Sequence, residues 1–439
     1  MNIRTAQLSL LPFILFIILF LGTGLYMQSQ GVDHAFEQLP GEVAILPALI
    51  LAAFLYPKPL NETLAMLVKG AGNSNIITMC MIFLLAGAFS SVAAATGGVQ
   101  AVVNAGLALI PSGYIVPGLF IIASLISLAM GTSVGTIAAL APIAVGFAEQ
   151  TEAAPALLAG TLLGGAMVGD NLSVISDTTI AATRTQGVAM QAKFYENIKP
   201  VLPVAIVTIG VLILLSEGEA PVPGDATQWL LTLPYLAILI LALARVNVFI
   251  VLILGTILAG VQGVAAGTYE LSSFGGDIAA GFASMQGIFL LAMFVGSLAE
   301  FVKQQGGLQW IAGGISRLAE RASGKGNRAQ QLAIGALVFI TDICIANNTV
   351  AIVVTGDVSR IIAEKNNISG KRTASILDIF SCIGQGMIPY GHQALLLSAT
   401  FAIAPWEVVI KNYYSLFLLA GVLLFISFTS DQASNKVQD

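Results

Sequence analysis

The sequence predicts an all-α polytopic membrane protein. Of its 439 residues, 57% are hydrophobic and only 9% are charged, and the mean hydropathy is +0.90. Soluble domains carry about 25% charged residues. Apolar stretches near the ~20 residues that cross a bilayer as a helix recur along nearly the whole chain. We therefore expect about 11–13 transmembrane helices, arranged as two inverted repeats with broken helices or hairpins.

The expected spans follow these apolar stretches in order. The first, Leu8 to Leu25, lacks a small-x-small cleavage site and precedes many more spans, so we interpret it as a helix and not as a signal peptide. Some of the spans are half-helices or hairpins. We place them near residues 8–27, 41–56, 76–96, 114–130, 132–148, 153–183 (interrupted), 200–216, 228–244, 247–263, 278–301, 330–345, 346–362, 373–403 (interrupted) and 406–428.

Charged residues gather in the loops between these spans. Lys58 and Lys69 lie in one loop, and the segment 303–328 is rich in lysine and arginine. Acidic residues mark the loops that hold Asp33 and Glu217. By the positive-inside rule, the basic loops face the cytoplasm.

The two halves of the sequence resemble each other. Residues 82–86 (IFLLA) recur as residues 288–292, an offset of 206, and a glycine pair follows each copy. The basic and acidic flanks give the two copies opposite directions, which is typical of secondary transporters. We predict N-terminal helices at 1–72, a first repeat at 73–200, connecting helices at 201–276, a second repeat at 277–429 and a C-terminal tail at 430–439.

The segment Gly169–Thr179 (GDNLSVISDTT) is the most polar stretch at membrane depth. An ionisable group at a helix centre costs roughly 2.5–3.5 kcal/mol on insertion scales, so it indicates ion, proton or substrate binding. Asp170 and Asp177 would lie roughly 10 Å apart on a continuous helix. Either the helix breaks between them, or one carboxylate binds a cation while the other titrates.

Three further polar breaks interrupt apolar runs. They contain Thr132 and Ser133, then Asn347 and Asn348 shortly after Asp342, and finally His392 in the segment 384–393. About 215 residues separate the first two breaks. Broken backbone at membrane depth is tolerated where it lines a cavity, and carboxylate, carbonyl and hydroxyl oxygens suit hard cations. The alternative is that these side chains are helix caps and interhelical contacts.

The remaining charged and reactive residues receive simpler interpretations. We expect Asp357 and Asp378 to pair with Arg360 or Arg372, and Glu300 to end a span. Residues 131–135 match GxSxG, but that nucleophile motif requires a strand–turn–helix. The sequence contains no HExxH, Walker A or dinucleotide motif and no zinc spacing. It therefore predicts neither an enzyme nor a resident cofactor.

The string at 169–179 resembles the signature of the NhaC-type sodium/proton antiporters of the ion transporter superfamily. The resemblance implies that Asp170, Asn171, Ser173 and Asp177, with the adjoining Thr178, form a cation or substrate site. Two positions depart from the pattern. Many relatives have lysine where this chain has Asn171, and many have Pro-Trp-Asn where it has PYGH at 389–392.

These features predict an antiporter that exchanges Na⁺ or Li⁺ for H⁺ by alternating access. In the simplest mechanism, Asp170 or Asp177 holds either Na⁺ or a proton. The alternatives are a Na⁺- or H⁺-coupled carrier of a small organic anion or amino acid, and an ion channel. We expect an integral protein of a bacterial cytoplasmic membrane, with a homodimer as the candidate assembly and no nucleic acid as partner. His392 could carry a proton, contact an organic carboxylate or serve in packing.

Overall fold

The computed structural model describes residues 3–32, 38–109, 111–151, 153–216, 229–321 and 327–429, and this described part contains helices and no strands. By length and composition, eight helical stretches within it are long and apolar enough to cross a membrane, and five shorter apolar helices accompany them. The all-α membrane fold is therefore confirmed. The predicted acidic loops at Asp33 and Glu217 and the predicted tail at 430–439 lie outside the described residues.

The N-terminal third holds a peripheral group of helices and the first half of the repeat. Asparagine caps start some of the long helices: the Asn73 side chain, for example, accepts a hydrogen bond from the Asn75 backbone N–H at 3.0 Å. The helices are α1 (Ile3–Leu8), α2 (Leu11–Ile17), α3 (Thr23–Ser29), α4 (Gly41–Ala44), α5 (Leu46–Leu55), α6 (Leu60–Ala71), α7 (Ser74–Ala95), α8 (Gly98–Leu109), α9 (Ile115–Met130), α10 (Ser133–Gln150), α11 (Pro155–Leu172) and α12 (Asp177–Gln186).

The rest of the chain contains connecting helices, the second half of the repeat and two final helices. These are α13 (Met190–Leu215), α14 (Leu233–Leu243), α15 (Val248–Ala265), α16 (Phe274–Ser284), α17 (Gln286–Gln304), α18 (Gly307–Arg321), α19 (Arg328–Ile345), α20 (Asn348–Lys365), α21 (Gly370–Met387), α22 (His392–Phe401), α23 (Pro405–Ile410) and α24 (Tyr413–Phe428).

Helix boundaries repeat at a constant spacing between the two halves. Helices α10, α11 and α12 correspond in length and order to α20, α21 and α22, and their first residues differ by 348 − 133 = 215, 370 − 155 = 215 and 392 − 177 = 215. Upstream, α7 and α17 end 304 − 95 = 209 residues apart. The halves are therefore one structural unit built twice.

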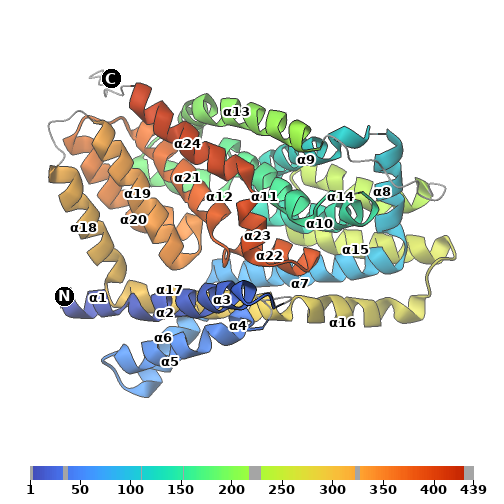
Figure 1. The fold of residues 1–439 in the computed structure, drawn as a ribbon, viewed down its shortest axis with the longest axis horizontal. Helices are drawn as coiled ribbons and strands as arrows, with labels where there is room; N and C mark the ends of the chain where they lie inside the picture. The colour runs from blue at the N-terminus through green and yellow to red at the C-terminus, as the bar shows by residue number, and fades with distance from the viewer. Residues whose placement is uncertain are drawn as a thin grey trace.

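The two units run in opposite directions and exchange parts. Helix α7 leads to α8 at one end of the molecule, whereas α17 leads to α18 at the other end (Figure 1). Helix α12 packs against α20 and α21 of the second unit, and α22 packs against α10 and α11 of the first. Each unit thus inserts its short helix into the other, as in the inverted repeats of many transporters.

Two sequence-based expectations about the repeat need correction. The structural offset of α7 and α17 is 209, so the five-residue match at an offset of 206 is out of register by about one helical turn. Apolar helices rich in leucine and alanine resemble themselves at such a shift, because residues three or four apart share a face. The breaks are also shorter than expected, since helical backbone continues into both ends of each polar string. The predicted segment boundaries stay a prediction.

Candidate functional site

Two equivalent breaks form sharp joints between helices. Helix α9 ends at Gly131 in a left-handed conformation (φ 69°), and the extended Thr132 then caps α10. In the second unit, Ala346 (φ 52°) and the extended Asn347 form the same joint between α19 and α20. Asn347 accepts a hydrogen bond from the Val350 backbone N–H at 3.0 Å. Thr132 and Asn347 are therefore helix caps as well as site candidates.

A second pair of breaks separates α11 from α12 and α21 from α22. Between α11 and α12, Ser176 caps the new helix by accepting from the Thr179 backbone N–H at 3.2 Å, and its hydroxyl donates to the Asp170 carbonyl at 3.1 Å. Ser173 donates to the Leu128 carbonyl at 3.1 Å. The hydroxyls of the polar string thus replace the backbone hydrogen bonds that the break removes. Its two aspartates are left on either side of the break.

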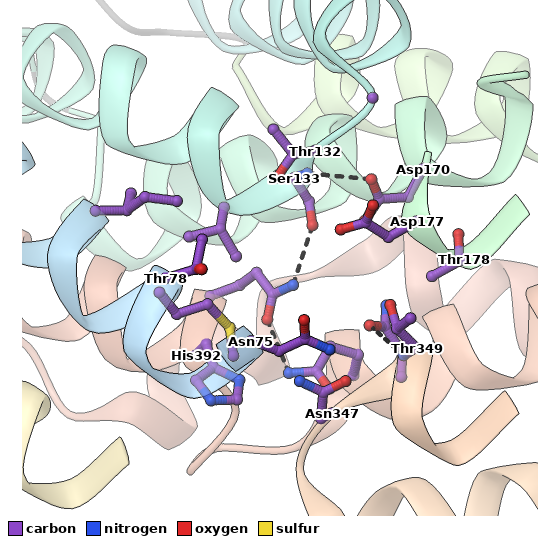
Figure 2. A pocket seen from close by; sticks show the side chains of 17 residues that line it. Asn75, Thr78, Thr132, Ser133, Asp170, Asp177, Thr178, Asn347, Thr349 and His392 are labelled. Atoms are coloured by element: carbon purple, nitrogen blue, oxygen red, sulfur yellow. Dashed lines mark hydrogen bonds between the residues drawn. The ribbon is translucent and has the colours of Figure 1, made fainter. Parts of the chain in front are cut away.

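These breaks surround a cavity of about 100 Å³ (Figure 2). The first residue of each of α10, α12, α20 and α22 lines it: Ser133, Asp177, Asn348 and His392. Asp170 faces the same space from the last turns of α11. The full lining is Asn75, Thr78, Met79, Ile82, Gly131, Thr132, Ser133, Val134, Asp170, Asp177, Thr178, Asn347, Asn348, Thr349, Gln385, His392 and Gln393.

A chain of hydrogen bonds joins the two units across this cavity. The Ser133 backbone N–H donates to Asp170 Oδ1 at 3.1 Å, and the Ser133 hydroxyl accepts from Gln393 Nε2 at 3.0 Å. Gln385 Nε2 in turn donates to Gln393 Oε1 at 2.8 Å. Asp170 is therefore held at the N-terminus of α10, where the helix dipole favours a negative charge.

Four helix N-termini meeting at one cavity give it a positive backbone potential. Asp177 lies in the first turn of α12, and Asp170 faces α10. The first turns of α20 and α22 contain no acidic residue. The two carboxylates thus occupy the side of the cavity that the first unit forms, and the side formed by the second unit is uncharged apart from its helix ends.

Asn347 also borders a second, smaller cavity of about 40 Å³. This cavity reaches Asn73, Glu300 and Lys303. Glu300 is paired with Lys69 at 2.8 Å, and not with a residue of its own span. Asn347 therefore lies between the central cavity and a route toward the basic loops.

Most of the predicted site residues come together in this cavity. Thr132, Ser133, Asp170, Asp177, Thr178, Asn347, Asn348 and His392 line it, whereas Asn171, Ser173 and Asp342 do not. The Asn171 side chain turns away and donates to Tyr414 Oη at 2.9 Å. Asp342 is buried on α19 against Gly384. A role in binding for these three residues stays a prediction.

Sequence reasoning missed several lining residues. Asn75 and Thr78 enter from α7, where isolated polar residues near the start of an apolar span give no signal. Gln385 and Gln393 had a usable signal, because they lie 215 residues after Asp170 and Thr178. The correct repeat register therefore identifies them as the second unit's counterparts of two first-unit site residues.

The prediction for Asp378 was wrong. Asp378 is fully buried and pairs with the equally buried Lys193 at 2.8 Å. Arg360 pairs instead with Asp357 at 3.4 Å, as expected, and Arg372 pairs with Glu196 at 3.1 Å. Spacing along one helix suggested the wrong partners, because Lys193 comes from α13 and reaches α21 only through the fold.

The described residues contain no group of three histidine, cysteine or acidic side chains that could hold a metal ion. A resident transition-metal centre would need such a group. Na⁺ binding at Asp170 and Asp177 would use fewer charged ligands together with neutral oxygens, and it stays a prediction.

Known proteins resemble the first half of the chain. A model described as the Na⁺/H⁺ antiporter family matches residues 5–218, just under half of the chain. Residues 5–218 belong to the Na⁺/H⁺ antiporter family. The match contains the GDNLSVISDTT string and both cavity carboxylates. It places the chain among transporters and not among enzymes.

Two curated proteins align with parts of the chain. A malate-2H⁺/Na⁺-lactate antiporter of Bacillus subtilis is 33% identical over 139 residues, which are 31% of this chain and 29% of that protein. An uncharacterized Na⁺/H⁺ antiporter of Haemophilus influenzae is 27% identical over 174 residues, 39% of this chain and 36% of that protein. The chain thus matches only about a third of the length of each relative.

Among solved structures, the crystal structure of the Alcanivorax borkumensis YdaH transporter superposes with a TM-score of 0.43 and 15% identity. The superposition covers 88% of this chain and 95% of that one. At this level the likeness carries no argument about function.

Proposed function

We propose that this protein is a secondary antiporter that exchanges Na⁺ or Li⁺ for H⁺ across a bacterial cytoplasmic membrane. The observation that carries the proposal is the placement of Asp170 and Asp177. A helix break separates them, and both face one buried cavity bounded by the broken helices of both units. Carboxylates at this depth are costly unless they bind a cation or a proton.

Competition between the two ions provides the coupling. A carboxylate that holds Na⁺ or H⁺ is neutral and can be carried between the two faces of the membrane, whereas the bare anion would bear the cost of a buried, unpaired charge. Hydroxyl and amide oxygens of Thr132, Ser133 and Asn348 stand by to complete the coordination of Na⁺. Binding one ion therefore requires release of the other.

The inverted repeat supplies the second requirement, access from alternate sides. Because the units are equivalent and opposite, the joint at Gly131–Thr132 can take the conformation of the joint at Ala346–Asn347, and the reverse. At present the small cavity beside Asn347 extends the central cavity toward Glu300. The equivalent extension beside Thr132 would serve the other side of the membrane.

Purified protein in liposomes that contain a pH-sensitive dye tests the proposal. A pulse of external NaCl or LiCl should alkalinise the lumen when protons leave in exchange for the cation, and KCl should not. Asp177→Asn, which keeps the side-chain volume and removes the charge, is the matched control and should give no response. A wild-type protein that moves no protons with Na⁺ or Li⁺, with or without added organic solutes, would exclude the antiporter.

A second function, cation-coupled exchange of small organic acids, is favoured by one observation. The N-termini of α20 and α22 face the cavity without any acidic residue in their first turns. Helix N-termini of this kind bind carboxylates, and one relative is a malate-2H⁺/Na⁺-lactate antiporter. The same liposomes, pulsed with lactate, malate and amino acids, decide between the two functions. A strict requirement for an organic solute would select the second.

A further inference from the structure

A buried ion pair lies directly behind the cavity. Lys193 on α13 and Asp378 on α21 have no solvent exposure, and Lys193 Nζ lies 2.8 Å from Asp378 Oδ2. The hydroxyl of Thr178, which lines the cavity, is hydrogen-bonded to Asp378. Asn171, the residue after the cavity carboxylate Asp170, contributes its carbonyl to the same group at 2.9 Å from Nζ. The pair is therefore one side chain away from the cavity.

The surroundings of the Lys193 ammonium have the composition of a cation site. Its partners are the Asn171 carbonyl at 2.9 Å, the Thr179 hydroxyl at 2.7 Å and the Asp378 carboxylate at 2.8 Å. These oxygens satisfy the three N–H donors of the ammonium. Carbonyl, hydroxyl and carboxylate oxygens are also the ligands of hard metal cations.

The residues around the ammonium hold more acceptors than it uses. Asn171 Oδ1, Asn197 Oδ1 and Asp378 Oδ1 are buried and have no hydrogen-bond partner among the described residues. All three residues are fully buried. Buried polar atoms are nearly always paired, so three unpaired oxygens in one cluster indicate capacity for a further ligand. A metal cation takes more oxygen ligands than the three of an ammonium.

The repeat shows that the ion pair is not needed to hold the break. In the first unit, Asn197 Nδ2 donates to the Asn171 carbonyl at 2.8 Å. In the second, at an offset of 215, Asn412 Nδ2 donates to the Gly386 carbonyl at 2.9 Å. The positions equivalent to Lys193 and Asp378 hold the apolar residues Val408 and Leu163. One asparagine therefore caps the second break without any charge.

Buried ion pairs are weak contributors to stability, because the desolvation cost offsets the attraction. Their presence in one unit and absence from the other calls for a different explanation. We propose that the oxygens of Asn171, Thr179 and Asp378 form a binding site for a monovalent alkali cation, which the chain fills with its own Lys193 ammonium. This inference rests on the proposed function, and it adds that one cation of the transport machinery is covalently part of the protein.

Removing the ammonium should open this site to Na⁺ or Li⁺. In Lys193→Met, the Asp378 carboxylate loses its partner, and the purified protein should be less stable than wild type in choline chloride. Replacing choline by Na⁺ at the same ionic strength should restore stability. We expect the apparent Tm of this variant to rise by about 3 °C more than that of wild type, from the binding of one ligand to the folded state alone.

Two variants serve as controls. Lys193→Met/Asp378→Asn removes both charges, so it should fold and show only the wild-type response to Na⁺. Asn412→Ala removes the equivalent cap in the second unit, so it should lose stability to the same extent in Na⁺ and in choline. Lys193→Gln replaces Lys193→Met if the latter yields no folded protein.

The outcome is decided by the salt dependence. A Na⁺ response of the Lys193 variants no greater than wild type overturns the proposal and leaves a purely structural ion pair. An enhanced response that persists in the double variant also overturns it, since the cation would then not bind at Asp378. Because this assay measures binding, a failure of wild-type Na⁺/H⁺ exchange in liposomes would not alter its result, and the two proposals fail separately.

Discussion

Gly131 and Ala346 occupy equivalent left-handed positions at the ends of α9 and α19, with φ values of 69° and 52°. Glycine adopts this conformation freely, whereas another L-residue there costs roughly 1–2 kcal/mol. The same exchange made in opposite directions at the two sites should therefore change the free energy of unfolding with opposite signs. Gly131→Ala should destabilise the protein and Ala346→Gly should stabilise it.

The structure sets the size of each effect. Ala346→Gly removes strain of roughly 1–2 kcal/mol and returns about 0.4–1 kcal/mol through the freer unfolded chain. The expected net gain is about 1 kcal/mol. At Gly131, an added Cβ would lie 2.9 Å from Ile175 Cγ1 and 3.1 Å from the Ile175 carbonyl oxygen. Overpacking typically costs roughly 1–3 kcal/mol, so the net loss should be about 2–4 kcal/mol.

Unfolding of the purified protein in mixed micelles, followed by tryptophan fluorescence, measures both changes. Gly118→Ala on the same α9 is the matched control, because its Cβ would meet no atom within 4 Å. Ile175 lies in the break between the two cavity carboxylates, so Gly131→Ala should also lower transport in liposomes. The reasoning is refuted if Gly131→Ala is as stable as Gly118→Ala, or if the two joint variants shift in the same direction.

Three further predictions concern the cavity directly. Asp170→Asn and Asp177→Asn should each reduce Na⁺-driven proton movement to the level of empty liposomes while the melting temperature is retained; near-normal transport by both would contradict competition at these carboxylates. Asn347→Ala and Asn348→Ala should raise the KM for Na⁺ by roughly 5- to 30-fold, equivalent to the loss of one contact of about 1–2 kcal/mol, and unchanged kinetics would remove the second unit from the site. His392→Gln should raise the KM and leave the pH profile near pH 6.5 unchanged, since the carboxylates carry the competition; a displaced profile would identify the imidazole as a proton carrier.

The sequence predicted the kind of fold and the membrane-depth polar breaks well, because both depend on local composition. An apolar run of membrane length can only be a helix in lipid, and a string such as GDNLSVISDTT has no place in such a run without a cavity. The break between Asp170 and Asp177, one of the two arrangements considered, is present. The presence of both residues at one cavity follows from it.

Contacts between distant segments could not be read in this way. Lys193 lies close in sequence to Glu196 and Lys199, in a stretch that looks like a polar helix end, yet it is fully buried. Its partner Asp378 is 185 residues away (378 − 193). Nothing in the local pattern of either segment distinguishes a pair at the protein centre from two charges at a surface. The constant offset of 215 was the signal with long range, and its register became clear only from helix boundaries.

The exchange of short helices between the units has a consequence for how the protein is made. The wall of the cavity that faces Asp170 and Asp177 includes α20 and α22, and α22 begins only at His392. A ribosome must therefore synthesise most of the chain before either aspartate meets its final surroundings. Until then, the first unit waits in the membrane as an incomplete half, with two acidic side chains and a gap that only the end of the chain fills. Biogenesis of this transporter thus ends with an insertion event, in which the last-made helices thread into a partner already in place.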